Sequence, residues 1–120
     1  MSRLRSDFWA SAFLRRCAVE GVDAVLRRRG AAEAGAIFVK VDHLNGTASL
    51  FGPAPPSLVS ADGQDRLFAP VLSAVPPADV EERMKREMRF DPDLWLLEVD
   101  SADGRHLLDL AADESPKTRA

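Results

Sequence analysis

The feature that most constrains the fold is the alternating stretch AIFVKVDH, from Ala36 to His43. Successive side chains of a β-strand point to opposite faces, so one face would carry Ile37, Val39 and Val41, and the other Phe38, Lys40 and Asp42. Asn45-Gly46 follows and predicts the two positive-φ positions of a tight hairpin turn. TASLFG then predicts the returning strand, so we expect antiparallel sheet here.

Residues 7–20 predict an amphipathic helix near the N-terminus. Its apolar residues recur at spacings of three and four: Phe8, Trp9, Ala12, Phe13, Cys17 and Ala18. Ser6 is the expected N-cap and Gly21 the expected stop. Cys17 is the only cysteine, and its place in the apolar stripe predicts a buried, inert thiol.

Residues 22–29 fit two structures. Their apolar residues alternate, as in a strand, although Ala, Leu and Arg are also good helix formers. The break at Gly21 favours the strand. Further along, Asp62-Gly63 predicts a turn, GPAPPS an extended loop, and RLFAPVL a short edge strand that Pro70 limits.

A second helix is expected to begin at Pro76 and Pro77, since helix N-termini tolerate missing amide hydrogens. Its buried stripe would be Val80, Met84 and Met88, spaced by four residues. Its outer face offers two possible ion pairs, Glu81–Lys85 and Glu82–Arg86. Phe90 is expected to close the helix against the core.

The stretch DPD then predicts a joint between this helix and a late strand, LWLLEVDS. Asp91 precedes a proline, which disfavours helical dihedrals. Along the strand, Trp95, Leu97 and Val99 would share one face, and Leu94, Leu96 and Glu98 the other. Asp91 and Asp93 also suggest a paired-carboxylate site for a metal or for acid–base chemistry. Because acids are common in turns, we favour the structural joint.

The whole pattern predicts one α+β domain over residues 1–110: an N-terminal amphipathic helix, a mostly antiparallel sheet with an Asn-Gly hairpin, and a second helix before the late strand. RHLLDL offers a further short strand, and residues 111–120 are expected to be a frayed tail.

Charge is unevenly distributed along the chain. Residues 1–29 hold seven arginines against three acids, whereas the whole chain has a net charge of −3. If Arg3, Arg5, Arg15 and Arg16 converged with the arginines at 27–29, they could contact nucleic acid, with Phe8 and Trp9 as stacking surfaces. The acidic remainder would repel phosphate, so a solvated helix face is the favoured interpretation.

Known catalytic and cofactor-binding patterns are absent from the sequence. It contains no GxSxG elbow, P-loop or GxGxxG fingerprint, and three Cys and His residues are too few for a structural zinc site. His43 and Asp42 are neighbours that would point to opposite faces, so they predict no acid–base pair. We expect no catalytic residue, metal or cofactor.

By elimination, the expected function is that of a small cytoplasmic, non-enzymatic protein-interaction module, without a membrane segment. A partner or a second copy could pair with the strand at Leu94–Ser101 or cover the first helix. The candidate interaction residues are Arg5, Trp9, Arg15, Arg16, Asp91, Asp93 and Trp95. The alternatives are a nucleic-acid-associated factor using the arginines, and a small enzyme or ligand-binding protein using Asp91 and Asp93.

Three stretches, RLRSDFWASAFLRR, GAIFVKVDHLNGTASLFGPAP and RFDPDLWLLEVD, carry a resemblance in their order and spacing. They resemble a small bacterial family known only as a domain of unknown function (number fourteen ninety-one). The resemblance runs from about Arg3 to Asp100. It implies no activity, cofactor or catalytic residue that could be assigned to this chain.

Overall fold

The computed structural model describes residues 4–55 and 66–111. Within them the elements follow in the order α1 (Ser6–Glu20), β1 (Asp23–Arg28), β2 (Ile37–Asp42), β3 (Ala48–Pro53), β4 (Phe68–Val75), α2 (Pro77–Phe90) and β5 (Trp95–Asp100). The strands form one sheet in the spatial order β1-β5-β2-β3-β4. Only β2 and β5 are parallel neighbours in it; the other pairs are antiparallel. The predicted mostly antiparallel α+β fold is confirmed.

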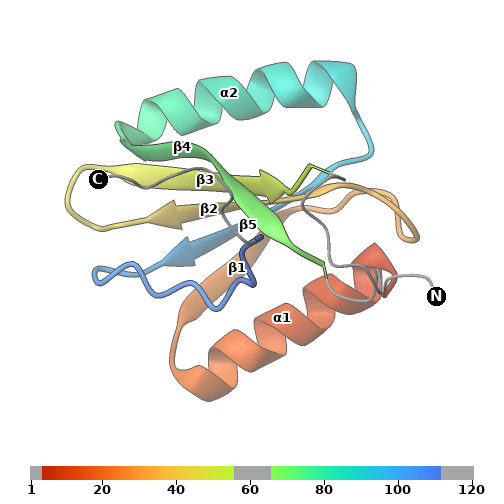
Figure 1. The fold of residues 1–120 in the computed structure, drawn as a ribbon, viewed down its shortest axis with the longest axis horizontal. Helices are drawn as coiled ribbons and strands as arrows, with labels where there is room; N and C mark the ends of the chain where they lie inside the picture. The colour runs from red at the N-terminus through yellow and green to blue at the C-terminus, as the bar shows by residue number, and fades with distance from the viewer. Residues whose placement is uncertain (1–3, 56–65, 112–120) are drawn as a thin grey trace.

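The two helices lie on opposite faces of the sheet, as Figure 1 shows, so the central strands are buried on both sides. On the α1 side, β2 and β5 contribute Ile37, Val39, Val41, Trp95, Leu97 and Val99. On the α2 side, the core contains Phe38, Ala48, Leu50, Leu94 and Leu96. The predicted two-face alternation of both strands is confirmed, and its apolar burial is the main source of stability.

Helix α1 buries Ala10, Phe13 and Cys17 against the sheet and ends at Gly21, whose φ is +76°. Glycine adopts that left-handed conformation without steric cost, so the predicted stop is confirmed. Three members of the predicted stripe are exposed instead: Phe8, Ala12 and Ala18. Each residue advances 100° around a helix, which places Phe8 nearly opposite the buried arc.

Ser6 is not the N-cap of α1. Arg5 occupies that position without a side-chain capping bond. Ser6 is buried in the first turn, and its hydroxyl donates a 2.6 Å hydrogen bond to the carbonyl oxygen of Gly35. The prediction was wrong because Ser6 belongs to the buried arc of α1. There its hydroxyl hydrogen-bonds a buried carbonyl oxygen of the loop before β2.

Helix α2 begins at Pro77 after Pro76, and it buries Val80 and Met84, as predicted. Phe90 does not close the helix against the core: it is 87 % exposed. The predicted outer ion pairs are also wrong. Lys85 lies 3.7 Å from Glu82, Arg83 pairs with Glu87, and Glu81 turns toward the sheet. Glu81 thus pairs with other elements instead of Lys85, while the i,i+4 pair that forms within α2 is Arg83–Glu87.

The turn between β2 and β3 differs from the expected one. Leu44 and Gly46 have positive φ, whereas Asn45 does not. The amide of His43 donates to the carbonyl of Thr47, and the side chain of Asn45 accepts the amide hydrogen of Thr47. The strands are joined as expected, but the predicted Asn45-Gly46 pair of positive-φ residues is not present.

Within residues 22–29, Asp23–Arg28 form the strand β1, as favoured. β5 lies between β1 and β2, so the expectation that a partner could pair with Leu94–Ser101 is wrong: both sides of that strand are already hydrogen-bonded. β4 is an edge strand, as predicted, but it is not short and Pro70 does not limit it: the strand has eight residues and continues to Val75. RHLLDL forms no strand and contributes only a bridge between Leu110 and Phe68.

Several predictions fall outside the described residues. These are the contribution of Arg3 to a basic surface, the turn at Asp62-Gly63, the end of the GPAPPS loop and residues 112–120 of the expected tail. Neither helix in the described part of the chain is long and apolar enough to cross a membrane. Cys17 is buried, and burial raises the pKa of its thiol, in agreement with the expected inert cysteine.

Candidate functional site

Helix α2 covers only part of its face of the sheet. Its buried residues pack with side chains from β2, β3 and the start of β5. Toward β1, the same face carries polar side chains and one exposed valine. We call this surface the open face: Asp23, Val25, Arg27, Lys40, Asp42, Glu98 and Asp100. Directly opposite residues in neighbouring strands share a face, which places these residues together.

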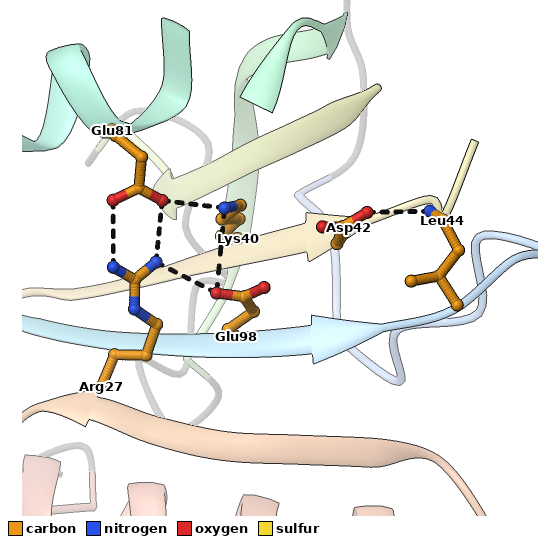
Figure 2. A network of polar contacts seen from close by, with 6 residues as sticks. All are labelled: Arg27, Lys40, Asp42, Leu44, Glu81 and Glu98. Atoms are coloured by element: carbon orange, nitrogen blue, oxygen red, sulfur yellow. Dashed lines mark hydrogen bonds and ion pairs between the residues drawn. The ribbon is translucent and has the colours of Figure 1, made fainter. Parts of the chain in front are cut away.

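Two cations and two anions form a network between α2 and the open face (Figure 2). The guanidinium of Arg27 donates to both oxygens of Glu81 at 2.8 and 3.0 Å and to Glu98 at 3.0 Å. Lys40 donates to Glu81 at 2.8 Å and lies 3.8 Å from Glu98. The side chain of Lys40 is only 8 % exposed, and a buried charge requires such partners.

The two carboxylates of the network have opposite pKa shifts. Hydrogen bonds from Arg27 and Lys40 lower the pKa of Glu81 to about 2. Burial raises the pKa of Glu98, and the nearby Asp100 adds to that shift against the attraction of both cations. The difference follows from position: the side chain of Glu98 is 19 % exposed and that of Glu81 is 37 % exposed.

Three aspartates form a row across β1, β5 and β2. Asp23 is opposite Asp100, and Asp100 is opposite Asp42. Like charges directly opposite one another destabilise a sheet. One carboxylate oxygen from each of Asp42, Glu98 and Asp100 lies within 4.8 Å of the other two, so these three residues offer the oxygen ligands that a divalent cation prefers.

Two of these three carboxylates already have structural partners. Asp42 accepts the amide hydrogen of Leu44 at 2.8 Å (Figure 2), and Glu98 accepts from Arg27. The third, Asp100, and its neighbour Asp23 differ: within the described residues their carboxylates have no hydrogen bond or ion pair. The open face thus has two charged regions. In one, its cations and Glu98 form a network of zero net charge with Glu81 of α2. In the other, the negative charges of the aspartate row are only partly balanced by hydrogen-bond donors.

Sequence reasoning missed this site, although a signal was present. Lys40 interrupts the apolar alternation of one strand, and Glu98 interrupts that of another. A charged residue inside a buried strand requires a countercharge from another element. The pairing of β2 with β5 and the identity of Glu81 as the shared partner come from the tertiary structure.

The predicted arginines do not converge on one surface. Arg5, in front of α1, pairs with Asp7 and lies over the ring of Phe8 at 5.0 Å. Arg16, on α1, donates to the carbonyl of Leu107, and Arg15 is exposed. Arg27 lies on the opposite side of the sheet, with α2. A continuous basic surface for nucleic acid is therefore not formed by these residues.

The two tryptophans have different environments. Trp95 is 1 % exposed, and its indole N–H donates to the carbonyl of Ala31 at 2.8 Å, so it belongs to the core. Trp9 stacks on Phe13 and contacts Phe68. Trp9 also lines a hollow of about 120 Å³ beside α1, which is smaller than the ~300–1,000 Å³ of most small-molecule sites.

Asp91 and Asp93 form the joint between α2 and β5. One carboxylate oxygen of Asp91 accepts the amide hydrogen of Asp93 at 3.1 Å, and the amide of Asp91 donates to the carbonyl of Glu87. The side chain of Arg28 donates to the carbonyl of Pro92. These contacts account for the turn, and neither described hollow is lined by the two acids.

The two histidines contact residues of β3. His43 is hydrogen-bonded to the hydroxyl of Ser49 at 2.8 Å. His106 packs on Phe51 with ring centroids 4.9 Å apart, and burial lowers the pKa of its imidazole. Ser49 is buried, and its hydroxyl also accepts the amide hydrogen of Ala74 at 2.9 Å. Nδ1 of His106 accepts the amide hydrogen of Leu108 at 3.0 Å.

Comparisons with known proteins agree with the resemblance. A family model described as "Protein of unknown function (DUF1491)" matches residues 4–109, and no curated protein matches the chain. The solution structure of a protein from A. tumefaciens is 35 % identical, with a TM-score of 0.79, and the match covers 97 % of this chain and 99 % of that one.

Two structures of DUF1491 family proteins from Caulobacter crescentus are also similar. The crystal structure is 33 % identical, with a TM-score of 0.73, over 91 % of this chain and 98 % of that one. The NMR structure is 36 % identical, with a TM-score of 0.72, over 92 % and 97 %. The fold described above is therefore shared with experimentally determined structures.

Proposed function

We propose that this chain, which belongs to the DUF1491 family of proteins of unknown function, is a small cytoplasmic, non-enzymatic protein-interaction module. Its docking site is the outer edge of β1 together with the adjacent part of the open face. The observation that carries this proposal is the position of β1 at one end of the sheet.

The two ends of the sheet are not equivalent. At the β4 end, Phe68 exchanges backbone hydrogen bonds with Asp109 and Ala111, and Pro70 interrupts the donors of the strand. β4 also has register shifts against β3. Natural sheets protect their edges by such covering segments, prolines and bulges.

The β1 end is less protected. The ladder between β1 and β5 is regular from Asp23 to Leu26 and shifts only between Leu26 and Arg28. Among the described residues, strands pair with β1 on the β5 side only. A partner in extended conformation could therefore add to this edge through main-chain hydrogen bonds. Val25, which is 57 % exposed, offers it an apolar contact.

A comparison of two valine substitutions tests the proposal. A tagged copy would be incubated with its native lysate, with and without nuclease, in the wild-type, Val25→Lys and Val19→Lys forms. Val19 is a matched control, since it is 79 % exposed on α1. A lysine on an edge strand discourages pairing, while its stem can lie along the surface without disturbing the fold.

The expected result is a nuclease-resistant protein partner that Val25→Lys loses and Val19→Lys retains. Retention that is equal in both variants would contradict the assignment of the docking site to β1. Material that disappears after nuclease treatment would instead favour the nucleic-acid alternative. Circular dichroism of each variant would verify that the fold is intact.

A further inference from the structure

We propose that the partner at the β1 edge is a second copy of this chain. Two copies would pair antiparallel through their β1 strands, about a two-fold axis that passes beside Val25, and would continue the sheet from one copy into the other. This inference rests on the proposed function, because it uses the same edge.

A two-fold interface requires a surface that is complementary to itself, since each contact occurs twice with the roles exchanged. With Val25 opposite its own copy, Ala24 lies opposite Leu26, and Asp23 lies beside Arg27, at the register shift between Leu26 and Arg28. The pairs thus join valine with valine, apolar with apolar and acid with base. β1 is self-complementary in this register.

The neighbouring registers are less favourable. In an antiparallel continuation of one sheet, directly opposite residues share a face, so the axis can move only in steps of one residue along the strand. An axis beside Ala24 would place Asp23 opposite Val25. An axis beside Leu26 would place Val25 opposite Arg27. Both would put a charged residue against the exposed valine, which leaves the Val25 register as the favoured one.

Charge within each copy supports the same register. Asp23 is exposed, has no ion pair among the described residues and lies opposite Asp100. A guanidinium brought beside Asp23 would offset the repulsion between these two aspartates.

Arg27 can supply that guanidinium. The hydrogen bonds that it makes to Glu81 and Glu98 use its two terminal nitrogens, and Figure 2 shows them at one end of the side chain. Arginine has five N–H donors, so its Nε–H stays available for a carboxylate from a second copy. The network within each copy and the contact between copies are compatible.

The apolar contacts extend in the same way. Val25 is 57 % exposed on the open face. On the other face, Ala24 and Leu26 are partly buried against the core that α1 covers. Pairing would remove the exposed valine from water and would join the partly buried residues of the two copies across the new ladder.

The test is the mass of the protein in solution, measured by sedimentation velocity and light scattering over a series of concentrations. The wild-type chain is expected to reach twice its 13.1 kDa. Val25→Lys opposes two lysines at the axis, and Asp23→Lys opposes a lysine to Arg27. Each is expected to weaken dimerisation by roughly tenfold or more, since like charges face each other once at the axis in Val25→Lys and twice, on either side of it, in Asp23→Lys.

Two control variants should leave dimerisation unchanged. Val19→Lys repeats the valine substitution on α1, and Glu82→Lys repeats the charge reversal at a side chain that is 69 % exposed on α2. Hydrogen exchange of the β1 amides gives a second measure. In the wild type their protection should rise with protein concentration, and Val25→Lys should abolish that rise.

Two results would overturn the inference. The first is a wild-type chain that stays monomeric at about 100 μM, a concentration at which micromolar dimerisation would be detected. The second is a dimer that Val25→Lys and Asp23→Lys leave intact. The proposed function fails separately. A monomer that still loses a lysate partner through Val25→Lys would reject self-pairing and keep the docking edge. A monomer whose lysate partner is retained by Val25→Lys would reject both.

Discussion

The substitution Glu81→Gln tests whether the charge network holds α2 to the sheet. Glu81 accepts hydrogen bonds from Arg27 and Lys40. Glutamine keeps the size of the side chain but removes its charge. Lys40, which is 8 % exposed, would keep a neutral hydrogen-bond acceptor there and only one countercharge, Glu98, at 3.8 Å. We therefore expect the variant to fold with a lower free energy of unfolding.

The pKa of Glu81 gives the magnitude. The pKa falls from 4.5 to about 2 on folding. Because one pKa unit corresponds to about 1.4 kcal/mol, the charge of Glu81 contributes at most roughly 3.4 kcal/mol to the free energy of unfolding at neutral pH. The side chain is 37 % exposed, and solvent screens an ion pair of that exposure. We therefore expect a loss of about 1–2 kcal/mol for the variant.

The dependence on pH has a definite sign. The folded-state pKa of Glu81 lies below its value in the unfolded chain. The contribution of its charge to the free energy of unfolding is therefore complete well above pH 4.5 and is lost as the pH falls toward 2. At pH 3.5, about two fifths of it should be gone. The difference in unfolding free energy between wild type and variant should therefore be smaller at pH 3.5 than at pH 7.

Urea unfolding, followed by circular dichroism at both pH values, measures this difference; urea is uncharged and does not screen the ion pairs. Glu87→Gln is the matched control, since Glu87 pairs with Arg83 on the surface of the same helix. It should cost about 0.5 kcal/mol or less. An equally small loss for Glu81→Gln at pH 7, or a difference that grows at pH 3.5, would refute the reasoning.

Three further predictions concern the packing of the loops and of α1. Gly30→Ala should lower the unfolding free energy by about 2 kcal/mol or more, because a Cβ there would clash with the backbone carbonyl of Asp93; Gly21→Ala, which has open space but a φ of +76°, should cost about 1 kcal/mol in chemical denaturation. Ser6→Ala should cost about 1–2 kcal/mol in the same assay, since it removes the buried hydrogen bond to Gly35, and an unchanged stability would contradict that role. A thiol reagent should modify Cys17 only at the rate of unfolding, because the side chain is fully buried; rapid labelling of the native protein would disprove this.

Local patterns were sufficient where one physical rule decides the outcome. The alternation in Ile37–Asp42 predicts a strand with two distinct faces, and Gly21 and Pro77 predict helix ends through backbone sterics alone. Predictions of single contacts were weaker. Ser6 is a good N-cap by residue type, but the buried arc of α1 gives its hydroxyl another partner, Gly35.

The candidate site shows the same limit. The sequence drew attention to Asp91 and Asp93 because they are close along the chain, yet they form a turn. The open face joins residues from β1, β2, β5 and α2 that are far apart along the chain. Its members cannot be grouped before the strand order is known.

By itself, the sequence determined the types of most elements and the faces of its two central strands, because side-chain periodicity and backbone sterics act over a few residues. Only the tertiary structure decided that β5 lies between β1 and β2, that Glu81 is shared by Arg27 and Lys40, and that β1 is left at the edge. The physical reason is that strand order and countercharges depend on contacts between distant segments. A strand has the same local pattern whether it has one neighbour or two.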